Sequence, residues 1–291
     1  MKKENKAVYL GLDVGGTKIE LAEFDENFRL IKNSFLPTNE FRVGSIDFIK
    51  SIEGVIAENL KQSIRRIGIS FKGSINKGII VHSSLLGKEG GNFLLEQKFS
   101  QKFGLPVKLE NDVNAMAIAE GKFGQGQGVG SFVLLNLGTG IRISACCEGK
   151  IIRGHGGNAG EICQKQIRVS ELGDKIYPVD DFISGKGIAN VYAEISGKNL
   201  CAREIFEAVA YDKKAQEAVA LFAKYLSEFL IEICYFYDPE MIIINGSLKK
   251  AAHIFLPEVI RRYEQNTSIF FQAKKIEISS LESGPCLGVV S

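Results

Sequence analysis

The stretch that decides the fold of this chain is Ala7-Val8-Tyr9-Leu10-Gly11-Leu12-Asp13-Val14-Gly15-Gly16-Thr17-Lys18-Ile19-Glu20-Leu21-Ala22-Glu23-Phe24. An apolar run reaches Asp13, passes through Gly15 and Gly16, and resumes with alternating apolar and polar residues, which predicts a strand, a tight turn and a second strand. Glycines let consecutive amides face a phosphate. Thr17 adds a hydroxyl, Lys18 a cation, and Asp13 a carboxylate that can hold hydrated Mg²⁺. An ordinary glycine hairpin is the alternative, and residues further along the chain decide between the two.

Composition sets the class of protein. The 291 residues are 45% hydrophobic and 24% charged, which is typical of a soluble globular protein of two domains. The net charge of +2 gives no reason to expect nucleic acid or a membrane as partner. No apolar run is long enough to span a membrane, and after the basic residues 1–6 the apolar run meets Asp13 too soon for a signal peptide. The six cysteines have no Cys-x-x-Cys spacing, so we expect reduced thiols in a cytoplasmic protein.

The opening pattern occurs a second time about 125 residues later. A strand over residues 132–137 is followed by Gly138-Thr139-Gly140 and a strand over residues 141–147, so we predict a duplicated architecture with a hinge in the glycine-rich residues 121–130. Two more strands end in polar groups or glycine, at Asn111-Asp112 and at Asn245-Gly246. Because ligands of open α/β sheets bind at the carboxyl ends of strands, we expect a nucleotide site there. A helix is expected from Ala115, and further helices over residues 181–211, 213–237 and 254–263.

Five motifs in this order resemble the ROK family of sugar kinases, within the actin-like ATPase superfamily, over essentially the whole chain. The first phosphate motif is similar to Gly11-Leu12-Asp13-Val14-Gly15-Gly16-Thr17-Lys18. The catalytic motif is similar to Glu110-Asn111-Asp112-Val113-Asn114-Ala115, and the second phosphate motif to Leu137-Gly138-Thr139-Gly140-Ile141. Gly160-Glu161-Ile162 resembles the sugar-contacting motif, and the stretch from Asp238-Pro239-Glu240 to Gly246 the adenosine-side motif.

The resemblance implies an α/β fold of two actin-like ATPase (ribonuclease H-like) domains with a ligand cleft between them. We place these domains at residues 1–118 and 119–291, and allow for the last residues to pack back on the first. The implied activity is ATP-dependent phosphorylation of a hexose or N-acetylhexosamine at the 6-hydroxyl, as in N-acetylmannosamine kinases and glucokinases. The implied cofactors are ATP and Mg²⁺, and the implied assembly is a homodimer.

The resemblance also assigns roles to individual residues. Asp112 becomes the base that takes the proton of the sugar hydroxyl, which is a poor nucleophile until it loses that proton; capping of the next helix by Asn111-Asp112 is the alternative, and both can hold. The residues expected at ATP and its phosphates are Asp13 (with Mg²⁺), Gly15, Gly16, Thr17, Lys18, Gly138, Thr139, Gly140 and Gly246. Those expected at the sugar are Gly73, Asn111, Asp112, Glu161, Gln164 and Asp180.

The chain also departs from the family pattern. Most members carry a His and a cysteine cluster that bind zinc, whereas here Cys163-Gln164 replaces Gly-His and residues 165–180 hold no cysteine, so we expect no zinc. Asp180 stands where the family has a Glu, Arg142 replaces a Gly, and Phe71-Lys72-Gly73 replaces a Pro-Gly turn. These changes suggest a catalytically weak sugar sensor as an alternative, although a sensor would not need Asp112. A transcriptional regulator of this family would need a helix-turn-helix before the first strand, where only six residues stand.

Overall fold

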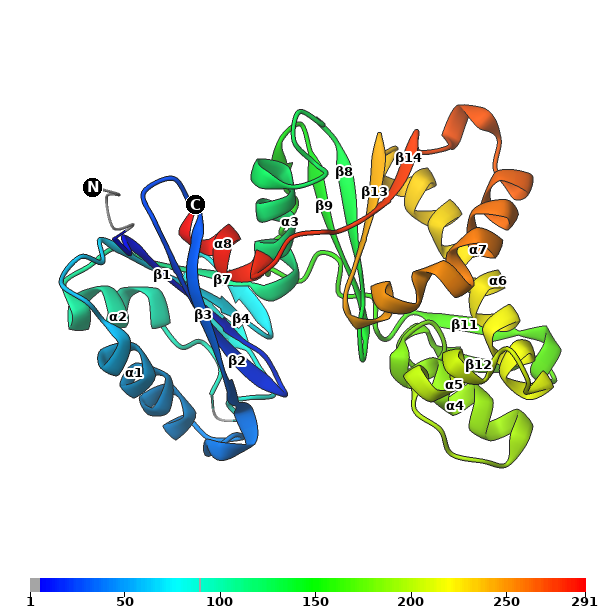
Figure 1. Cartoon of the computed structure of the whole chain (residues 1–291), viewed down its shortest axis with the longest axis horizontal. Helices are drawn as coiled ribbons and strands as arrows, with labels where there is room; N and C mark the ends of the chain where they lie inside the picture. The colour runs from blue at the N-terminus through cyan, green and yellow to red at the C-terminus, as the bar shows by residue number, and fades with distance from the viewer. Residues whose placement is uncertain (1–5, 89) are drawn as a thin grey trace. The chain divides into compact units, whose positions relative to one another are not determined.

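The computed structural model describes residues 6–88 and 90–291 and is drawn in Figure 1. The first five residues, and residue 89 of the expected loop 87–92, lie outside the described residues. The chain forms two compact units. The N-unit comprises Met1–Gln127, Ile151–Ala159 and Ser280–Ser291, and the C-unit comprises Gly128–Lys150 and Gly160–Ser279. The expected domain boundary after residue 118 falls inside the helix Asp112–Phe123. The N-unit itself continues to Gln127 and includes two later segments of the chain.

The N-unit is built on a five-stranded sheet with the order β3-β2-β1-β4-β7. The opening glycine turn joins β1 and β2, which pair antiparallel, whereas β1, β4 and β7 run parallel. A short antiparallel pair, β5 and β6, lies beside it. The strands are β1 (Tyr9–Val14), β2 (Lys18–Phe24), β3 (Leu30–Pro37), β4 (Arg66–Phe71), β5 (Ser74–Asn76), β6 (Ile79–His82) and β7 (Val107–Asn111).

The C-unit repeats this sheet. Its order is β10-β9-β8-β13-β14, with β8 and β9 antiparallel around the second glycine turn and β8, β13 and β14 parallel. The predicted duplication is therefore confirmed at the level of strand order and direction. The strands are β8 (Phe132–Leu137), β9 (Ile141–Cys147), β10 (Lys150–Ile151), β11 (Gln166–Val169), β12 (Lys175–Pro178), β13 (Met241–Asn245) and β14 (Lys275–Ile278).

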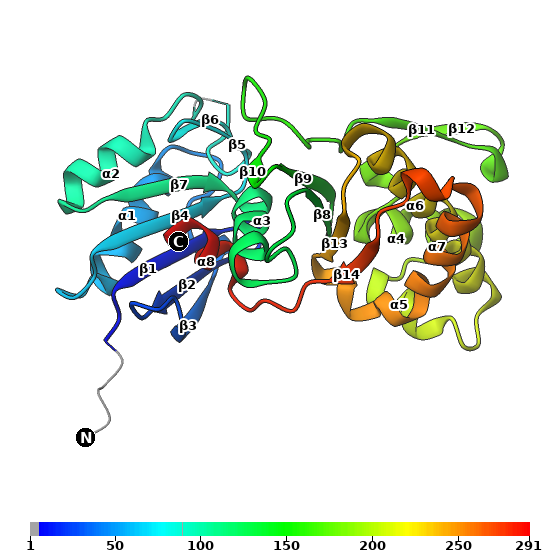
Figure 2. The same ribbon diagram turned by 90° about the horizontal axis from the view of Figure 1, so that it is seen from above.

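Helices cover both faces of the sheet in the N-unit (Figure 2). Leu12 and Phe48 belong to the core between the sheet and α1 and α2, whereas Ala115 and Cys286 belong to a separate core formed with α3 and α8. The last residues of the chain thus pack on the N-unit. The helices of the whole chain are α1 (Asp47–Asn59), α2 (Leu95–Phe103), α3 (Asp112–Phe123), α4 (Gly185–Ser196), α5 (Ala202–Ala208), α6 (Lys213–Tyr237), α7 (Ala252–Asn266) and α8 (Gly284–Val290), with 3-10 turns η1 (Thr38–Glu40), η2 (Ser170–Leu172), η3 (Val179–Asp181), η4 (Ser247–Ala251) and η5 (Ile269–Phe271).

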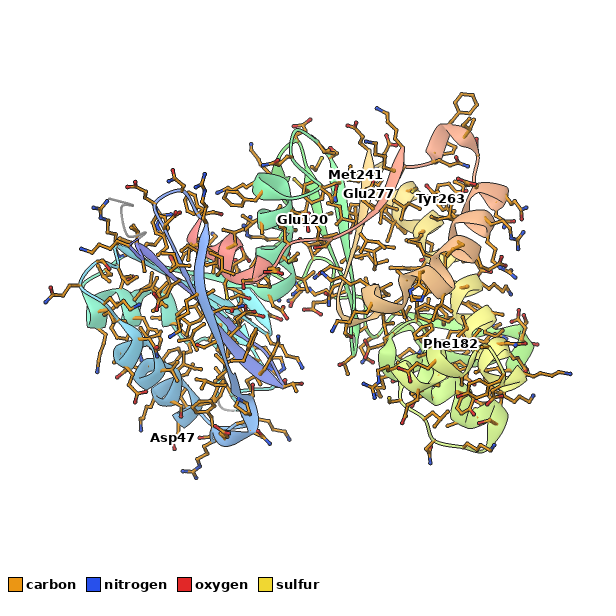
Figure 3. All side chains as sticks on the ribbon, in the orientation of Figure 1. Asp47, Glu120, Phe182, Met241, Tyr263 and Glu277 are labelled. Atoms are coloured by element: carbon orange, nitrogen blue, oxygen red, sulfur yellow. The ribbon has the colours of Figure 1, made fainter. Side chains whose placement is uncertain are left out.

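The C-unit core is organised by the long helix α6. Its apolar stripe packs with α4, α5 and α7 and with the inner face of the sheet. Phe182, labelled in Figure 3, is fully buried, and its ring centroid lies 5.0 Å from that of Tyr225 on α6. No helix in the described part of the chain is long and apolar enough to cross a membrane.

Four features differ from the sequence prediction. Helix α3 begins at Asp112 rather than Ala115, because the side chain of Asn111 caps it by accepting from the amides of Val113 and Asn114. Gly197, in the left-handed conformation, ends α4 and splits the expected helix over residues 181–211 into α4 and α5. The hairpin of β11 and β12 and helix α8 are not anticipated.

Candidate active site

The first glycine turn is held from outside by η1. The amide of Gly15 donates to the carbonyl of Lys18 (3.1 Å), which closes the turn. Thr38, almost fully buried, donates from its hydroxyl to the Gly15 carbonyl (2.9 Å) and from its amide to the Thr17 carbonyl (3.0 Å). Within residues 6–88 and 90–291, the amides of Gly16 and Thr17 have no hydrogen-bond acceptor. Two exposed amides on a braced turn suit the oxygens of a phosphate.

Asp13 lies on β1 just before this turn, between Glu20 of β2 and Ser70 of β4. The hydroxyl of Ser70 donates to Asp13 Oδ1 at 2.6 Å. Burial and, after it, the negative charge of Asp112 together raise the pKa of Asp13 from 3.8 to about 7, even though the Ser70 hydrogen bond opposes the rise. The ionised carboxylate therefore lacks enough compensating positive charge. A divalent cation would supply that charge, so the residues present fit Mg²⁺.

Two lysines border the turn. The ammonium of Lys18 lies 4.2 Å from the centre of the exposed Phe35 ring, a cation–π contact. The ammonium of Lys72 lies over Gly16, 3.0 Å from where a Cβ would stand. Its backbone is fixed on both sides, because the Lys72 amide donates to the carbonyl of Val14 (3.1 Å) and the Lys72 carbonyl accepts from the hydroxyl of Ser83 (2.6 Å). Lys72 therefore presents a cation to the turn expected to bind phosphate, which the sequence had shown only as a departure from the family.

The carboxyl end of β7 places Asn111 and Asp112 at the start of α3. Asn111 is fully buried, and its oxygen accepts from the amides of Val113 (2.9 Å) and Asn114 (3.1 Å). Its nitrogen donates to the carbonyl of Gly73 (2.9 Å), which ties together two of the residues expected at the sugar. Asp112, the first helical residue, is only partly buried. The cap thus uses the side chain of Asn111. The base role of Asp112 and sugar contact by Asn111 stay predictions.

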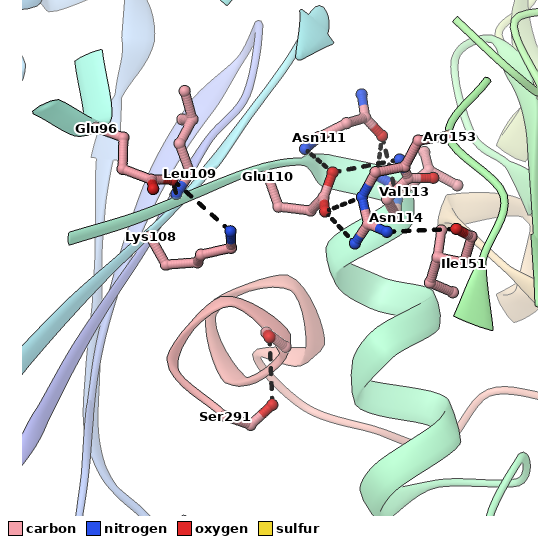
Figure 4. Close-up of polar contacts among 11 residues, drawn as sticks. Glu96, Lys108, Leu109, Glu110, Asn111, Val113, Asn114, Ile151, Arg153 and Ser291 are labelled. Carbon is pink, nitrogen blue, oxygen red and sulfur yellow. Dashed lines mark hydrogen bonds and ion pairs between the residues drawn. The ribbon is translucent and has the colours of Figure 1, made fainter. Parts of the chain in front are cut away.

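The same corner holds a buried ion pair that sequence reasoning missed (Figure 4). The carboxylate of Glu110, 4% exposed, accepts from Arg153 Nε at 2.8 Å and Nη2 at 2.6 Å. Its other oxygen accepts from the Asn111 amide (3.0 Å) and the side chain of Asn114 (3.3 Å). No sequence signal marks Arg153, because it lies 43 residues from its partner in a glycine-rich loop.

The second glycine turn, in the C-unit, is held by the start of α4. Gly185 donates its amide to the carbonyl of Gly138 (2.8 Å) and Lys186 to that of Thr139 (3.2 Å). Asp180 Oδ1 accepts from the amide of Ile141 (2.8 Å) and lies 2.6 Å from where a Cβ of Gly140 would stand. Asp180 therefore supports this turn in the structure, and its expected sugar contact stays a prediction.

The expected sugar residue Glu161 is paired within the C-unit. Arg142 on β9, whose side chain is 8% exposed, lies with its Nε 3.3 Å from Glu161 Oε1. Gln164 is exposed nearby in sequence. Gly246 follows β13 with a φ of 92°, and a Cβ there would collide with the Leu137 carbonyl, so glycine is required where β13 meets the second turn. Among the described residues, no group of three or more His, Cys, Asp and Glu side chains could hold a metal ion.

Each unit thus places a glycine turn at the carboxyl end of a strand of its mixed sheet, and the N-unit adds two interacting carboxylates, a geometry of nucleotide-binding α/β proteins. The sequence profile of the ROK family matches residues 9–289, so the chain belongs to the ROK family.

Known proteins agree with this assignment. The chain is 26% identical to an N-acetyl-D-glucosamine kinase of Haemophilus influenzae over 284 residues, covering 90% of this chain and 91% of that protein. It is 28% identical to a glucokinase of Halalkalibacterium halodurans, covering 88% and 85%. A crystal structure of a ROK family glucokinase from Streptomyces griseus in complex with glucose and AMPPNP superposes with a TM-score of 0.78 at 21% identity, covering 97% of this chain and 98% of that one. This last likeness shows the shared fold.

Proposed function

We propose that this protein is an ATP-dependent sugar kinase that phosphorylates the 6-hydroxyl of a hexose or N-acetylhexosamine. Family membership over residues 9–289 and relatives that are N-acetylglucosamine kinases and glucokinases support the kinase activity. The observation that carries the proposal is Asp112, a partly buried carboxylate at the first position of α3, beside a second carboxylate at Asp13. The preferred hexose or N-acetylhexosamine is to be identified by assay over a panel of sugars.

Asp112 acts as the general base in this proposal. A sugar hydroxyl loses its proton only as it attacks, so the base must be fixed in position at that moment. The first turn of α3 is rigid because Asn111 caps it and Glu110 holds Asn111 and Asn114 on either side. The N-terminal end of a helix also favours a negatively charged side chain, which suits a carboxylate at this position.

The glycine turns serve the phosphates. Phosphoryl transfer depends on positioning and on neutralising charge more than on covalent help. The amides of Gly16 and Thr17 and the ammonium of Lys72 supply donors in the N-unit, and the turn of Gly138 to Gly140 supplies amides in the C-unit. Asp13 would hold Mg²⁺, which when bound neutralises negative charge on the phosphates. Zinc has no role in the proposal.

The test is a coupled ADP-release assay over a panel of hexoses and N-acetylhexosamines, with ATP and Mg²⁺. We expect one or a few sugars to be turned over by the wild-type protein. Asp112→Asn should lower kcat by about 10²- to 10⁴-fold, the usual range for a general base, with sugar binding measured by calorimetry largely kept. Turnover close to wild type in this variant would refute the role of Asp112, and no turnover with any sugar would refute the kinase.

We also propose that the protein works in the cytoplasm as a homodimer. Five apolar residues that stand exposed near the end of α6 and on η5 support an association surface, because such groups are normally buried. The ring centroids of two of them, Tyr235 and Phe271, lie 5.7 Å apart. The exposed residues are Tyr235, Phe236, Ile269, Phe270 and Phe271. Light scattering after size exclusion would give the mass in solution, and a monomer at micromolar concentration would count against the dimer.

A further inference from the structure

We propose that Arg153 is a positioning residue for the phosphoryl transfer, which holds the catalytic corner of β7 and α3 in place through Glu110. The inference rests on the proposed role of Asp112. The corner is defined here as residues 110–114. In this proposal Arg153 does not contact the substrate. It acts through the carboxylate of Glu110, which it binds.

The ion pair between Arg153 and Glu110 is close and largely buried on the carboxylate side. Arg153 approaches a single oxygen of Glu110, Oε2, with two nitrogens, Nε at 2.8 Å and Nη2 at 2.6 Å. Two charge-assisted contacts therefore converge on that oxygen, and the pair of them is called the fork below. Glu110 is 4% exposed, whereas the arginine side chain is 42% exposed. Within the described residues, Arg153 is the only cation paired with this carboxylate. A buried carboxylate that loses its cation is strongly destabilised, so Glu110 depends on Arg153 to stay where it is.

Glu110 is linked in turn to the chain around the proposed base, Asp112. Glu110 Oε1 accepts hydrogen bonds from both the amide of Asn111 and the side-chain nitrogen of Asn114 (Figure 4). Glu110 therefore holds the chain on both sides of Asp112. If the carboxylate turned toward water, both donors would lose this acceptor in a buried place, and the chain around Asp112 would relax to recover hydrogen bonds. A shift of about 1 Å at a reacting group can cost about 100-fold in rate.

Arg153 is carried by a loop, residues 151–159. This loop belongs to the N-unit, although the residues before and after it belong to the C-unit. It is fastened to β5 as well, because Asn76 donates to the carbonyl of His155 (3.1 Å) and Ser74 is hydrogen-bonded to Asn158. Gly157, with φ of 77°, packs against the Ile75 carbonyl, where no side chain would fit.

The contacts of this loop with β5 and with Glu110 lie next to two residues expected at the sugar, Gly73 and Asn111. Strand β5 directly follows Gly73, whose carbonyl accepts from Asn111. The loop therefore holds the segment after Gly73 through residues 155–158 and the segment around Asp112 through Arg153. Loss of the Arg153 fork should disturb the sugar-facing residues and the base while leaving the ATP turn at Gly15 to Lys18 untouched.

The experiment compares three variants with wild type in the same assay, by kcat, sugar KM, ATP KM and thermal midpoint. Arg153→Met removes the fork, and Arg153→Lys keeps the charge with a single donor. The double variant Glu110→Gln/Arg153→Met removes both charges while leaving an acceptor for the Asn111 amide. The matched control is Arg203→Met on α5, which breaks an ion pair with Glu207 between two exposed side chains.

We expect Arg153→Met to lower kcat about 10- to 100-fold and to raise the sugar KM, with the ATP KM within about twofold of wild type. The kcat of Arg153→Lys should lie between the values of wild type and Arg153→Met, because one ammonium group cannot replace the two nitrogens of the fork. The double variant should recover the thermal midpoint but not kcat. Recovery of both would show a purely structural ion pair and overturn the proposal, as would wild-type kinetics in Arg153→Met. If Arg153→Met fails to fold, the lysine and double variants decide.

A second measurement separates this inference from the proposed function. Asp112→Asn is assayed on the same plate. Loss of turnover in Asp112→Asn with normal turnover in Arg153→Met leaves the kinase standing and overturns the inference. If wild type turns over no sugar, hydrogen exchange decides instead. Faster exchange at the amides of Val113 and Asn114 in Arg153→Met than in Arg203→Met supports the positioning role, and equal exchange overturns it.

Discussion

Replacing Asp13 by Asn should make the free protein more stable at pH 8 and nearly inactive. Asp13 is buried enough, and close enough to Asp112, that its pKa is raised from 3.8 to about 7. A carboxyl whose pKa is raised on folding favours the folded state while it is protonated. Its contribution to stability is therefore present below about pH 4, declines as the pH rises from about 4 to 7, and is absent above pH 7.

The size of the effect follows from that pKa difference. At about 1.4 kcal/mol per pH unit, it corresponds to about 4 kcal/mol between low pH and pH 8. Because Asp13 is only partly buried by surface area, solvent screens part of this cost, and we expect about 2 kcal/mol. Asn has nearly the same shape, can still accept from Ser70, and carries no charge. For a unit of this size the gain corresponds to a rise in unfolding midpoint of roughly 4 to 8 °C at pH 8.

The assay is thermal unfolding of wild type and Asp13→Asn from pH 5 to 8, without nucleotide or metal. The midpoint difference should grow with pH and level off above pH 7. Ser70→Ala is the opposing control, because it removes the hydrogen bond that lowers the pKa of Asp13 and should therefore destabilise at pH 8. Kinase turnover should be lost in Asp13→Asn, since the carboxylate expected at Mg²⁺ is gone. A variant less stable than wild type at pH 8, or a midpoint difference independent of pH, would refute the reasoning.

Two further predictions concern the phosphate turn and metal content. Lys72→Met should raise the ATP KM about tenfold, a typical loss for one charge-assisted contact, because the ammonium over Gly16 is removed. Lys77→Met serves as control, and equal ATP KM values in the two variants would contradict a phosphate-binding role for Lys72. Purified protein should contain no stoichiometric zinc by metal analysis, and a chelator should leave the unfolding midpoint unchanged. The reason is that residues 165–180, which include the β11–β12 hairpin, contain no cysteine. One zinc per chain would show that the zinc ligands come from elsewhere in the chain.

The sequence alone determined the local elements and the duplicated plan. Strands β1, β8 and β9 and helix α6 follow from runs of apolar residues whose periodicity is unambiguous. The two glycine turns, each between an apolar strand and an alternating one, reveal the repeated order of the sheets. Local signals suffice here, because strand and helix periodicity and turn chemistry depend on residues only a few positions apart.

Only the tertiary structure decided which groups act together. Arg153 meets Glu110 across 43 residues, Ser70 meets Asp13 across 57, and Asp180 reaches the amide of Ile141 across 39. None of these pairs has a spacing that a local pattern can express. The start of α3 at Asp112 also depended on the conformation of Asn111 after β7. Contacts of this kind arise when the sheet brings distant strand ends side by side, and burial then sets how strongly each charge needs its partner.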